Sequence, residues 1–129
     1  MAQKENNIIP MIFDEAFYRK MATQKWRQQD YKKAAEYYEK VLELSPKDFD
    51  IQQHYAQCLV KLNIGKKAER LFYENIVKDF HVAESFYELS QLNIELNEPN
   101  KAFLFGINYV ILSDDKDFRE MLEKTFEVA

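Results

Sequence analysis

Small residues recur along this chain at intervals of 34 positions. One set consists of Ala34, Ala68 and Ala102, and a second set, twelve residues earlier, consists of Ala22, Ala56 and Ser90. Helix backbones approach closely only where the side chains between them are small, so each set predicts one crossing between packed helices. Two crossings in every repeat predict a stack of helical hairpins that buries a continuous core from one repeat to the next.

The composition supports an all-α fold in one domain. Of the 129 residues, 47% are apolar and 15% are aromatic, which is enough to bury a core. Only two glycines and three prolines interrupt long runs of helix-forming residues. We expect a single domain over residues 10–129, preceded by a flexible N-terminus over residues 1–9.

Charge and cysteine usage narrow the range of partners. The net charge is −4 and no basic block is present, so we expect no nucleic-acid binding. No run approaches the ~20 apolar residues that cross a membrane, and the start lacks the features of a signal peptide, which predicts a cytoplasmic protein without membrane contact. The single cysteine, Cys58, allows no internal disulfide and supplies no metal cluster, and we interpret it as a structural residue. We therefore expect no metal and no cofactor.

The distribution of helix signals divides the chain into three hairpins and a final helix. We expect repeats over about residues 15–48, 49–82 and 83–116, and a capping helix over about residues 115–128. This organisation predicts seven helices.

Several residues are suited to start these helices. Asp30 and Asp48 are good N-caps, and the first helix starts at either Pro10 or Asp14. Pro99 fits the first turn of a helix because no backbone N–H is needed there.

Residues 15 to 116 resemble the tetratricopeptide repeat family, whose pattern is W-x2-L-G-x2-Y, then A-x3-F, then P. The matching positions are Ala34-x3-Tyr38 and Pro46 in repeat one, Ala68-x3-Phe72 in repeat two, and Phe86-x2-Leu89-Ser90 with Ala102 in repeat three. The resemblance implies a right-handed α-solenoid of three hairpins closed by the capping helix. Gly106 departs from the pattern, since it stands where an aromatic belongs. The second helix of repeat three is then either loosely packed or leaves a notch that the capping helix fills.

The same resemblance implies a concave groove, lined by the first helix of each hairpin, that binds a partner protein. The expected groove residues lie opposite the hairpin partner of each first helix. They are Arg19, Thr23, Trp26 and Arg27 in repeat one, Gln53, His54, Gln57 and Lys61 in repeat two, and Glu84, Tyr87, Glu88, Gln91 and Glu95 in repeat three. This groove runs from positive to negative. It suits a segment with an acidic end near Arg19 and Arg27 and a basic end near Glu88 and Glu95.

One subclass of the family binds the acidic C-termini of cytosolic heat-shock chaperones through a carboxylate clamp of basic residues and asparagines. The positions of this clamp carry Thr23, His54, Glu84 and Glu88 here. The two glutamates would repel a carboxylate, so we do not expect binding of a chaperone tail.

Two of the groove residues have a second interpretation. Trp26 is either an anchor in the groove or a filler against the next repeat. We interpret His54 as a neutral hydrogen-bonding residue, because no second histidine, cysteine pair or suitably spaced carboxylate supports a metal site.

Together these observations predict a non-catalytic adaptor or scaffold that binds a peptide or helix of a partner protein. No motif for nucleophilic, phosphate-binding or metal-dependent catalysis is present, so we expect no enzyme. One alternative is a dedicated chaperone for a single aggregation-prone client, similar to three-repeat secretion chaperones. Another is a self-associating structural module, or the N-terminal piece of a longer repeat protein. The expected state is a monomer or a weak homo-oligomer, with Tyr73, Phe103 and Phe126 as candidate contacts on the convex or terminal surfaces.

Overall fold

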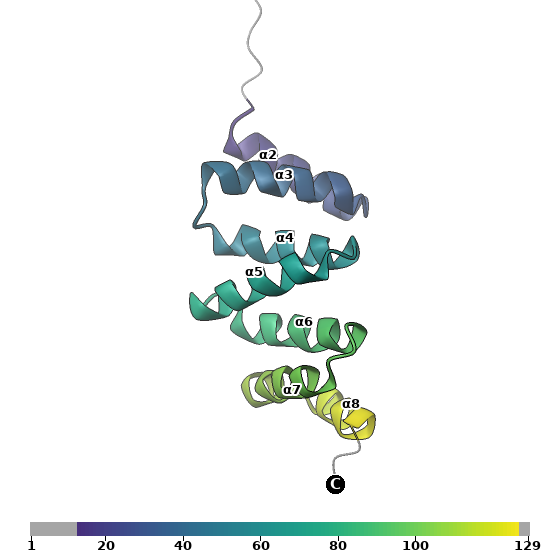
Figure 1. Cartoon of the computed structure of the whole chain (residues 1–129). Helices are drawn as coiled ribbons and strands as arrows, with labels where there is room; N and C mark the ends of the chain where they lie inside the picture. The colour runs from purple at the N-terminus through teal and green to yellow at the C-terminus, as the bar shows by residue number, and fades with distance from the viewer. Residues whose placement is uncertain (1–12, 127–129) are drawn as a thin grey trace, which may run out of the picture.

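The structure is a computed structural model that describes residues 13–126. The expected flexible segment over residues 1–9 and the end of the expected capping helix lie outside the described residues. Within the described range the chain forms α-helices and no strand (Figure 1). The helices are α2 (Glu15–Arg27), α3 (Tyr31–Leu44), α4 (Phe49–Lys61), α5 (Gly65–Val77), α6 (Val82–Glu95), α7 (Pro99–Ser113) and α8 (Lys116–Phe126).

The helices are stacked in chain order from α2 to α8 (Figure 1). Each helix packs against the next one along the chain, and α4 also contacts α6 directly. No comparable direct contact joins α3, α5 and α7 to one another. Side chains of α2, α4 and α6 border a common cavity, and we call this the concave side of the stack; α3, α5 and α7 form the opposite, convex side. This is the all-α solenoid that the repeat spacing predicts.

The small residues at 34-residue intervals lie inside the stack. All six are fully buried, namely Ala22, Ala34, Ala56, Ala68, Ser90 and Ala102. The Ser90 hydroxyl also donates a hydrogen bond to the backbone carbonyl of Ala102 at 2.8 Å, which joins α6 to α7. Small side chains at these positions let the helices of each pair approach closely.

Aspartates begin the first three helices of the array. The side chains of Asp14, Asp30 and Asp48 accept hydrogen bonds from backbone N–H groups in the first turns of α2, α3 and α4. Asp14 is thus the N-cap of the first described helix, while Pro10 lies outside the described residues. Pro99 is the first residue of α7, as its missing N–H allows.

The turn inside each hairpin has the same backbone geometry. Gln29, Asn63 and Asn97 lie 34 residues apart, and their φ angles are 60°, 63° and 59°. A left-handed residue of this kind ends a helix and reverses the chain, and asparagine tolerates it better than most residues. The chain reversal is therefore repeated along with the helix crossings.

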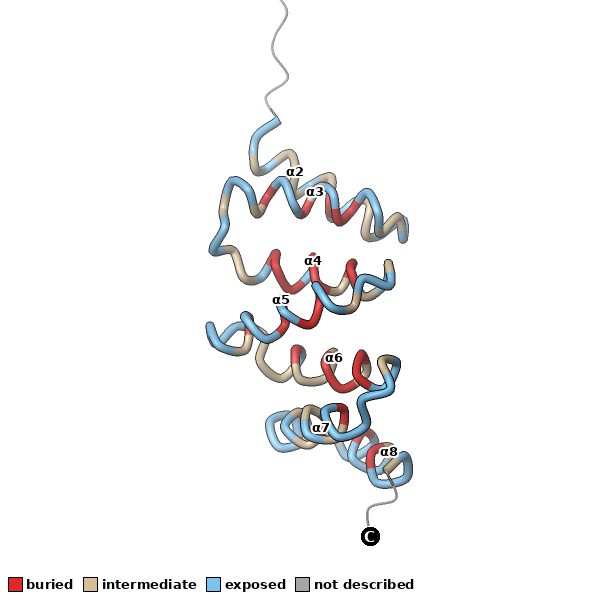
Figure 2. The backbone as a smooth tube through the Cα atoms, in the orientation of Figure 1, coloured by how far each residue is buried: buried red, intermediate tan, exposed pale blue. Residues whose placement is uncertain are grey.

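Aromatic and aliphatic side chains fill the space between the helices. Val41, Phe72 and Leu89 are completely buried in a core that runs through all three hairpins. Figure 2 shows this core as buried segments on the facing sides of successive helices. Cys58 is completely buried in the same core, and burial raises the pKa of its thiol to about 12. The burial and the raised pKa agree with the structural interpretation of this residue.

The departure from the repeat pattern at Gly106 is compensated by α8. Tyr38 and Phe72 fill the corresponding positions of the first two repeats. A Cβ on Gly106 would lie only 2.7 Å and 2.8 Å from the two terminal methyl groups of Leu122. Leu122 of α8 is 2% exposed and occupies the space that an aromatic would take. The structure therefore agrees with the interpretation that the capping helix fills a notch at Gly106.

Candidate functional site

A cavity of about 360 Å³ opens on the concave side, between α2, α4 and α6. Its lining residues are Trp26 from α2, Gln57, Val60 and Lys61 from α4, and Tyr87, Glu88, Gln91 and Glu95 from α6. Apart from Val60, each of these side chains is among those expected in the groove from the sequence. The concave face thus brings together residues that are up to 69 positions apart, as the numbers of Trp26 and Glu95 show.

A carboxylate lies against one wall of this cavity. The Gln57 amide donates a hydrogen bond to a carboxylate oxygen of Glu88 at 3.1 Å. Burial raises the pKa of Glu88, and the hydrogen bond from Gln57 and the charge of Lys61 offset this only in part. Glu88 is therefore a partly buried acid, and a further cation near it would stabilise its ionised form.

Aromatic rings pack around Trp26, the residue that α2 contributes to this cavity. Trp26 packs edge-on against Tyr31, with ring centroids 5.3 Å apart, and against His54 at 6.4 Å. His54 in turn stacks on Tyr38 at 5.9 Å, and the Lys61 ammonium lies 5.9 Å above the Tyr31 ring. Trp26 accordingly lines the cavity and packs against the hairpin at the same time, so both interpretations of this residue apply.

The position of His54 determines its charge. Loss of solvent around the imidazole lowers the pKa of His54, and the positive charge that His81 acquires on protonation lowers it further. A neutral imidazole at physiological pH donates and accepts hydrogen bonds without adding charge to the groove.

Tyr87 is held in place from the C-terminal side of the array. Its ring lies 5.2 Å from both Tyr109 of α7 and Phe118 of α8, measured between centroids. The Tyr109 hydroxyl donates a hydrogen bond to Asp115 at 2.7 Å. The capping helix thus fixes one of the groove residues.

The expected positive end of the groove lies along α2. A shallow hollow of about 660 Å³ is lined there by Arg19, Lys20, Thr23, Gln24, Arg27 and Gln28. Arg19 forms ion pairs with Glu15, at 2.7 Å, and with Asp48. Its charge is already compensated within the protein, so it is a structural residue that ties α2 to the start of α4. Lys20 and Arg27 carry the remaining positive charge of this hollow.

The prediction that Gln53 faces the groove is wrong. Gln53 is only 3% exposed, and its side-chain oxygen accepts hydrogen bonds from Asn75 at 2.8 Å and from Ser85 at 2.9 Å. Successive residues of a helix differ by about 100° in direction, so Gln53 points between α5 and α6 although its neighbour His54 reaches the concave side. Gln53 belongs to a buried amide network that joins repeats two and three.

Glu84 is exposed at the start of α6, outside the cavity. One of its carboxylate oxygens lies 3.9 Å from the His81 imidazole. Val60, which lines the cavity, and Tyr31, which supports Trp26, were not expected at this site. Val60 lies three residues after Gln57 on the same helix face, so helical spacing could have identified it, whereas the contact of Tyr31 with Trp26 depends on the hairpin.

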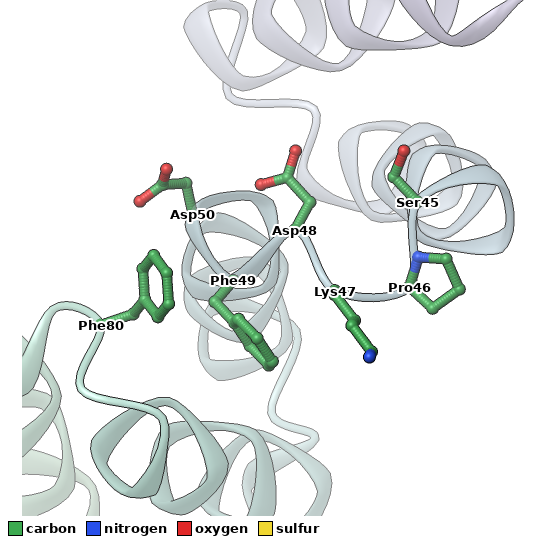
Figure 3. Close-up of a pocket in the computed structure, with 7 residues that line it drawn as sticks. All are labelled: Ser45, Pro46, Lys47, Asp48, Phe49, Asp50 and Phe80. Atoms are coloured by element: carbon green, nitrogen blue, oxygen red, sulfur yellow. The ribbon is translucent and has the colours of Figure 1, made fainter.

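A further hollow, of about 600 Å³, lies outside the groove at the junction between repeats (Figure 3). The loop between α3 and α4 and the start of α4 line it on one side, and Phe80 closes it on the other. The rings of Phe49 and Phe80 are 5.2 Å apart here, and His81 is hydrogen-bonded to Asp50 at 2.5 Å. These contacts connect successive repeats.

The concave site suits non-covalent binding. Over residues 13–126 no group of three or more His, Cys, Asp and Glu side chains converges as a metal site requires. None of the helices in this range is both long and apolar enough to cross a membrane. The cavity offers aromatic faces, amides, two carboxylates and one ammonium group, which are the groups that recognise an extended or helical peptide.

Residues 25–72, from the end of α2 into α5, match the family model described as tetratricopeptide repeat. The chain in the crystal structure of MamA protein is similar over 88% of this chain, with a TM-score of 0.76 and 19% sequence identity. This chain covers 62% of the length of that chain, and the likeness at this identity concerns the fold alone. No curated protein matches the sequence.

Proposed function

Because the chain carries tetratricopeptide repeats, which in general form non-catalytic protein-interaction modules, we propose that it binds a segment of a partner protein on its concave side. The cavity between α2, α4 and α6 carries this proposal, since it gathers side chains from three helices into one solvent-accessible site. We infer a cytoplasmic adaptor or scaffold that performs no catalysis itself.

The charges of the site suit a basic side chain of the partner. Glu88 and Glu95 face a single lysine, Lys61, in this cavity, so a lysine or arginine of the partner improves the charge balance. The aromatic faces of Trp26 and Tyr87 favour the same cation through their negative ring potential. Such a residue would also provide the charge partner that the partly buried Glu88 lacks.

The opposite end of the groove suits acidic residues. Lys20 and Arg27 line the hollow along α2, and this polarity orients the partner segment with its basic residue near α6. Arg19 plays no direct part because Glu15 and Asp48 already compensate it. An acidic chaperone tail is not the expected ligand, since Glu88 would repel it from the cavity.

The array is ordered before the partner binds. Helix α4 is held by the buried amides of Gln52, Gln53 and Asn75, and Tyr87 is held by rings from α7 and α8. A preformed site loses little conformational entropy on binding, so the partner segment bears most of the ordering cost.

The proposal can be tested with peptides selected against the folded protein by phage display. We expect basic and aromatic residues to be enriched among the selected peptides. Binding of one such peptide is then measured by fluorescence anisotropy for the wild type and for Glu95→Lys, a substitution at an exposed position of the cavity. We expect at least about tenfold weaker binding, because a repulsive charge replaces an attractive one.

The matched control is Glu36→Lys, the same charge reversal at an exposed position on the convex helix α3. This variant should bind like the wild type. Equal affinities of all three proteins, or equal losses in both variants, would exclude the cavity as the binding site.

A further inference from the structure

The outward face of α7 differs from the outward faces of the other two convex helices. The 34-residue register identifies six equivalent positions in each helix, and all of them are exposed. In α3 these positions carry Lys32, Lys33, Glu36, Lys40, Glu43 and Leu44. In α5 they carry Lys66, Lys67, Arg70, Glu74 and Val77, and the sixth position, Lys78, directly follows the helix. In α7 they carry Asn100, Lys101, Leu104, Asn108, Ile111 and Leu112.

Charged residues therefore dominate the outward faces of α3 and α5, whereas Lys101 is the only one on the outward face of α7. A solvated helix normally has a polar outer face, and a helix that is apolar all round is normally covered. Helices α3 and α5 are a suitable comparison for α7, since the three helices occupy equivalent places in one array. The composition of α7 thus indicates a surface that another element covers.

The apolar side chains on this face are substantially exposed. Leu104 is 61% exposed, Ile111 73% and Leu112 55%. In Figure 2 the backbone tube of α7 includes several segments coloured as exposed. None of the described residues packs over these three side chains to a degree that would bury them. An apolar surface of this kind on a folded domain marks an interaction site.

Two hollows extend this face toward α8. One, of about 170 Å³, lies between α7 and α8 beside Ile107, Ile111 and Leu122. The other, of about 400 Å³, lies beside Leu104 and Phe126. Phe103 lines both of them. The rings of Phe103 and Phe126 pack with their centroids 5.5 Å apart, and both rings line the hollow of about 400 Å³.

We propose that the outward face of α7 is a homodimer interface, in which α7 packs antiparallel against α7 of a second copy. The arrangement of charges favours this occupant. Lys101 lies near the start of the helix, and the exposed Asp114, whose carboxylate lies 3.9 Å from Arg119 of α8, directly follows its end. Antiparallel packing about a two-fold axis near Ile107 and Asn108 brings each Lys101 close to Asp114 of the other copy.

The same axis brings Leu104 of each copy beside Ile111 of the other, because it passes midway between these two positions of the helix. A two-fold interface must be complementary to itself; Lys101 lies at one end of this apolar face, and Asp114 directly follows the helix at the other end. The dimer covers the convex side near the C-terminal end of the array. It leaves α2, α4 and α6 free, so that each dimer presents two grooves and a partner with two binding segments gains avidity.

Sedimentation velocity over a wide range of protein concentration tests the proposal. We expect the wild type to approach twice its 15.5 kDa mass as the concentration rises. Ile111→Glu should raise the dimer dissociation constant on the order of a hundredfold, because one substitution places a charge at two symmetry-related sites. Val77→Glu is the matched control, since Val77 occupies the equivalent position of α5 and is 79% exposed. This control should dimerise like the wild type.

A covalent trap tests the antiparallel geometry. A cysteine introduced by Asn108→Cys lies next to the proposed axis and should form an intermolecular disulfide under mild oxidation. Lys40→Cys, at the equivalent position of α3, should not, and the native Cys58 is fully buried and does not compete. A wild type that stays monomeric at all concentrations, or equal cross-linking of both variants, overturns the proposal. An unchanged dimer of Ile111→Glu would place self-association elsewhere on the molecule.

Discussion

Substitution of Gly106 by alanine offers a sharp test of how α8 is held on the array. In most helix interiors this change is stabilising, because glycine is about 1 kcal/mol less favourable than alanine. Here the added Cβ would lie 2.7 Å and 2.8 Å from the two terminal methyl groups of Leu122, and 3.0 Å from the hydroxyl oxygen of Ser90. Both methyl groups are too close, so a rotation of the leucine end does not remove the overlap.

The magnitude follows from these two opposing terms. Overpacking of a filled core costs typically 1–3 kcal/mol, so we take about 2 kcal/mol for the overlap. Subtracting the gain of about 1 kcal/mol in helix propensity leaves a net destabilisation of about 1 kcal/mol for Gly106→Ala. Leu122→Ala by itself should cost about 3 kcal/mol, since it empties a buried site.

The double variant separates the two terms. With Leu122→Ala in place the overlap with the two methyl groups disappears and only the contact of 3.0 Å with the Ser90 hydroxyl remains, so Gly106→Ala should then stabilise the protein by up to about 1 kcal/mol. The expected coupling between the two sites is therefore up to about 2 kcal/mol. Urea unfolding followed by circular dichroism, at one fixed protein concentration, measures all four proteins of the cycle.

The outcome that would refute this reasoning is additivity. If Gly106→Ala stabilises the protein equally in both backgrounds, Leu122 does not occupy the space beside Gly106. Tryptophan fluorescence provides a second probe, because Trp26 lies in α2 at the other end of the array. Coincident transitions by both probes indicate that the repeats unfold together, as the free-energy comparison requires.

Two further predictions concern ionisable groups. Partial burial raises the pKa of Asp48, but hydrogen bonds from Arg19 and from the backbone N–H of Ile51 outweigh this and hold the pKa below its usual value. The stabilisation is therefore present above the ordinary pKa of aspartate and is lost as the pH falls through the lowered one. Asp48→Ala should cost about 1–2 kcal/mol at neutral pH through loss of the N-cap, and its melting temperature should approach that of the wild type toward pH 3; a constant difference would contradict this. Burial raises the pKa of Glu88, so ionised Glu88 destabilises the fold above that raised pKa and no longer does so below the ordinary pKa of glutamate. Glu88→Gln should therefore melt at a higher temperature than the wild type at neutral pH, with a difference that shrinks toward pH 4, and a lower melting temperature at neutral pH would show that the Glu88 charge is stabilising.

Much of the concave site followed from helical spacing within the repeats, but the exceptions show the limits of that reasoning. Trp26, Gln57, Tyr87 and Glu88 were expected in the groove and line one cavity. Gln53 was predicted on the same face as its neighbour His54, yet its side chain points in another direction and is buried against Asn75. Spacing along a helix gives only the approximate direction of a side chain. Whether that side chain is exposed or buried depends on the position of the neighbouring helix.

Charge is another property that the sequence alone describes incompletely. Arg19 counts as a positive groove residue when the residues of α2 are considered alone. In the structure, Asp48 lies across from it, 29 positions later in the chain, and the ion pair makes Arg19 a link between repeats. Such pairings depend on the packing of one hairpin on the next, which no local pattern specifies.

The all-α class, the 34-residue repeat, the helix crossings and most of the caps could be derived from the sequence. These features depend on local rules: small residues permit close approach, aspartates cap helices, and proline fits a first turn. The packing of the helices established that Leu122 fills the space beside Gly106, that Gln53 is buried, and that the apolar face of α7 remains exposed. Each of these results depends on what another helix places next to a given side chain, and that information comes from packing between distant parts of the chain.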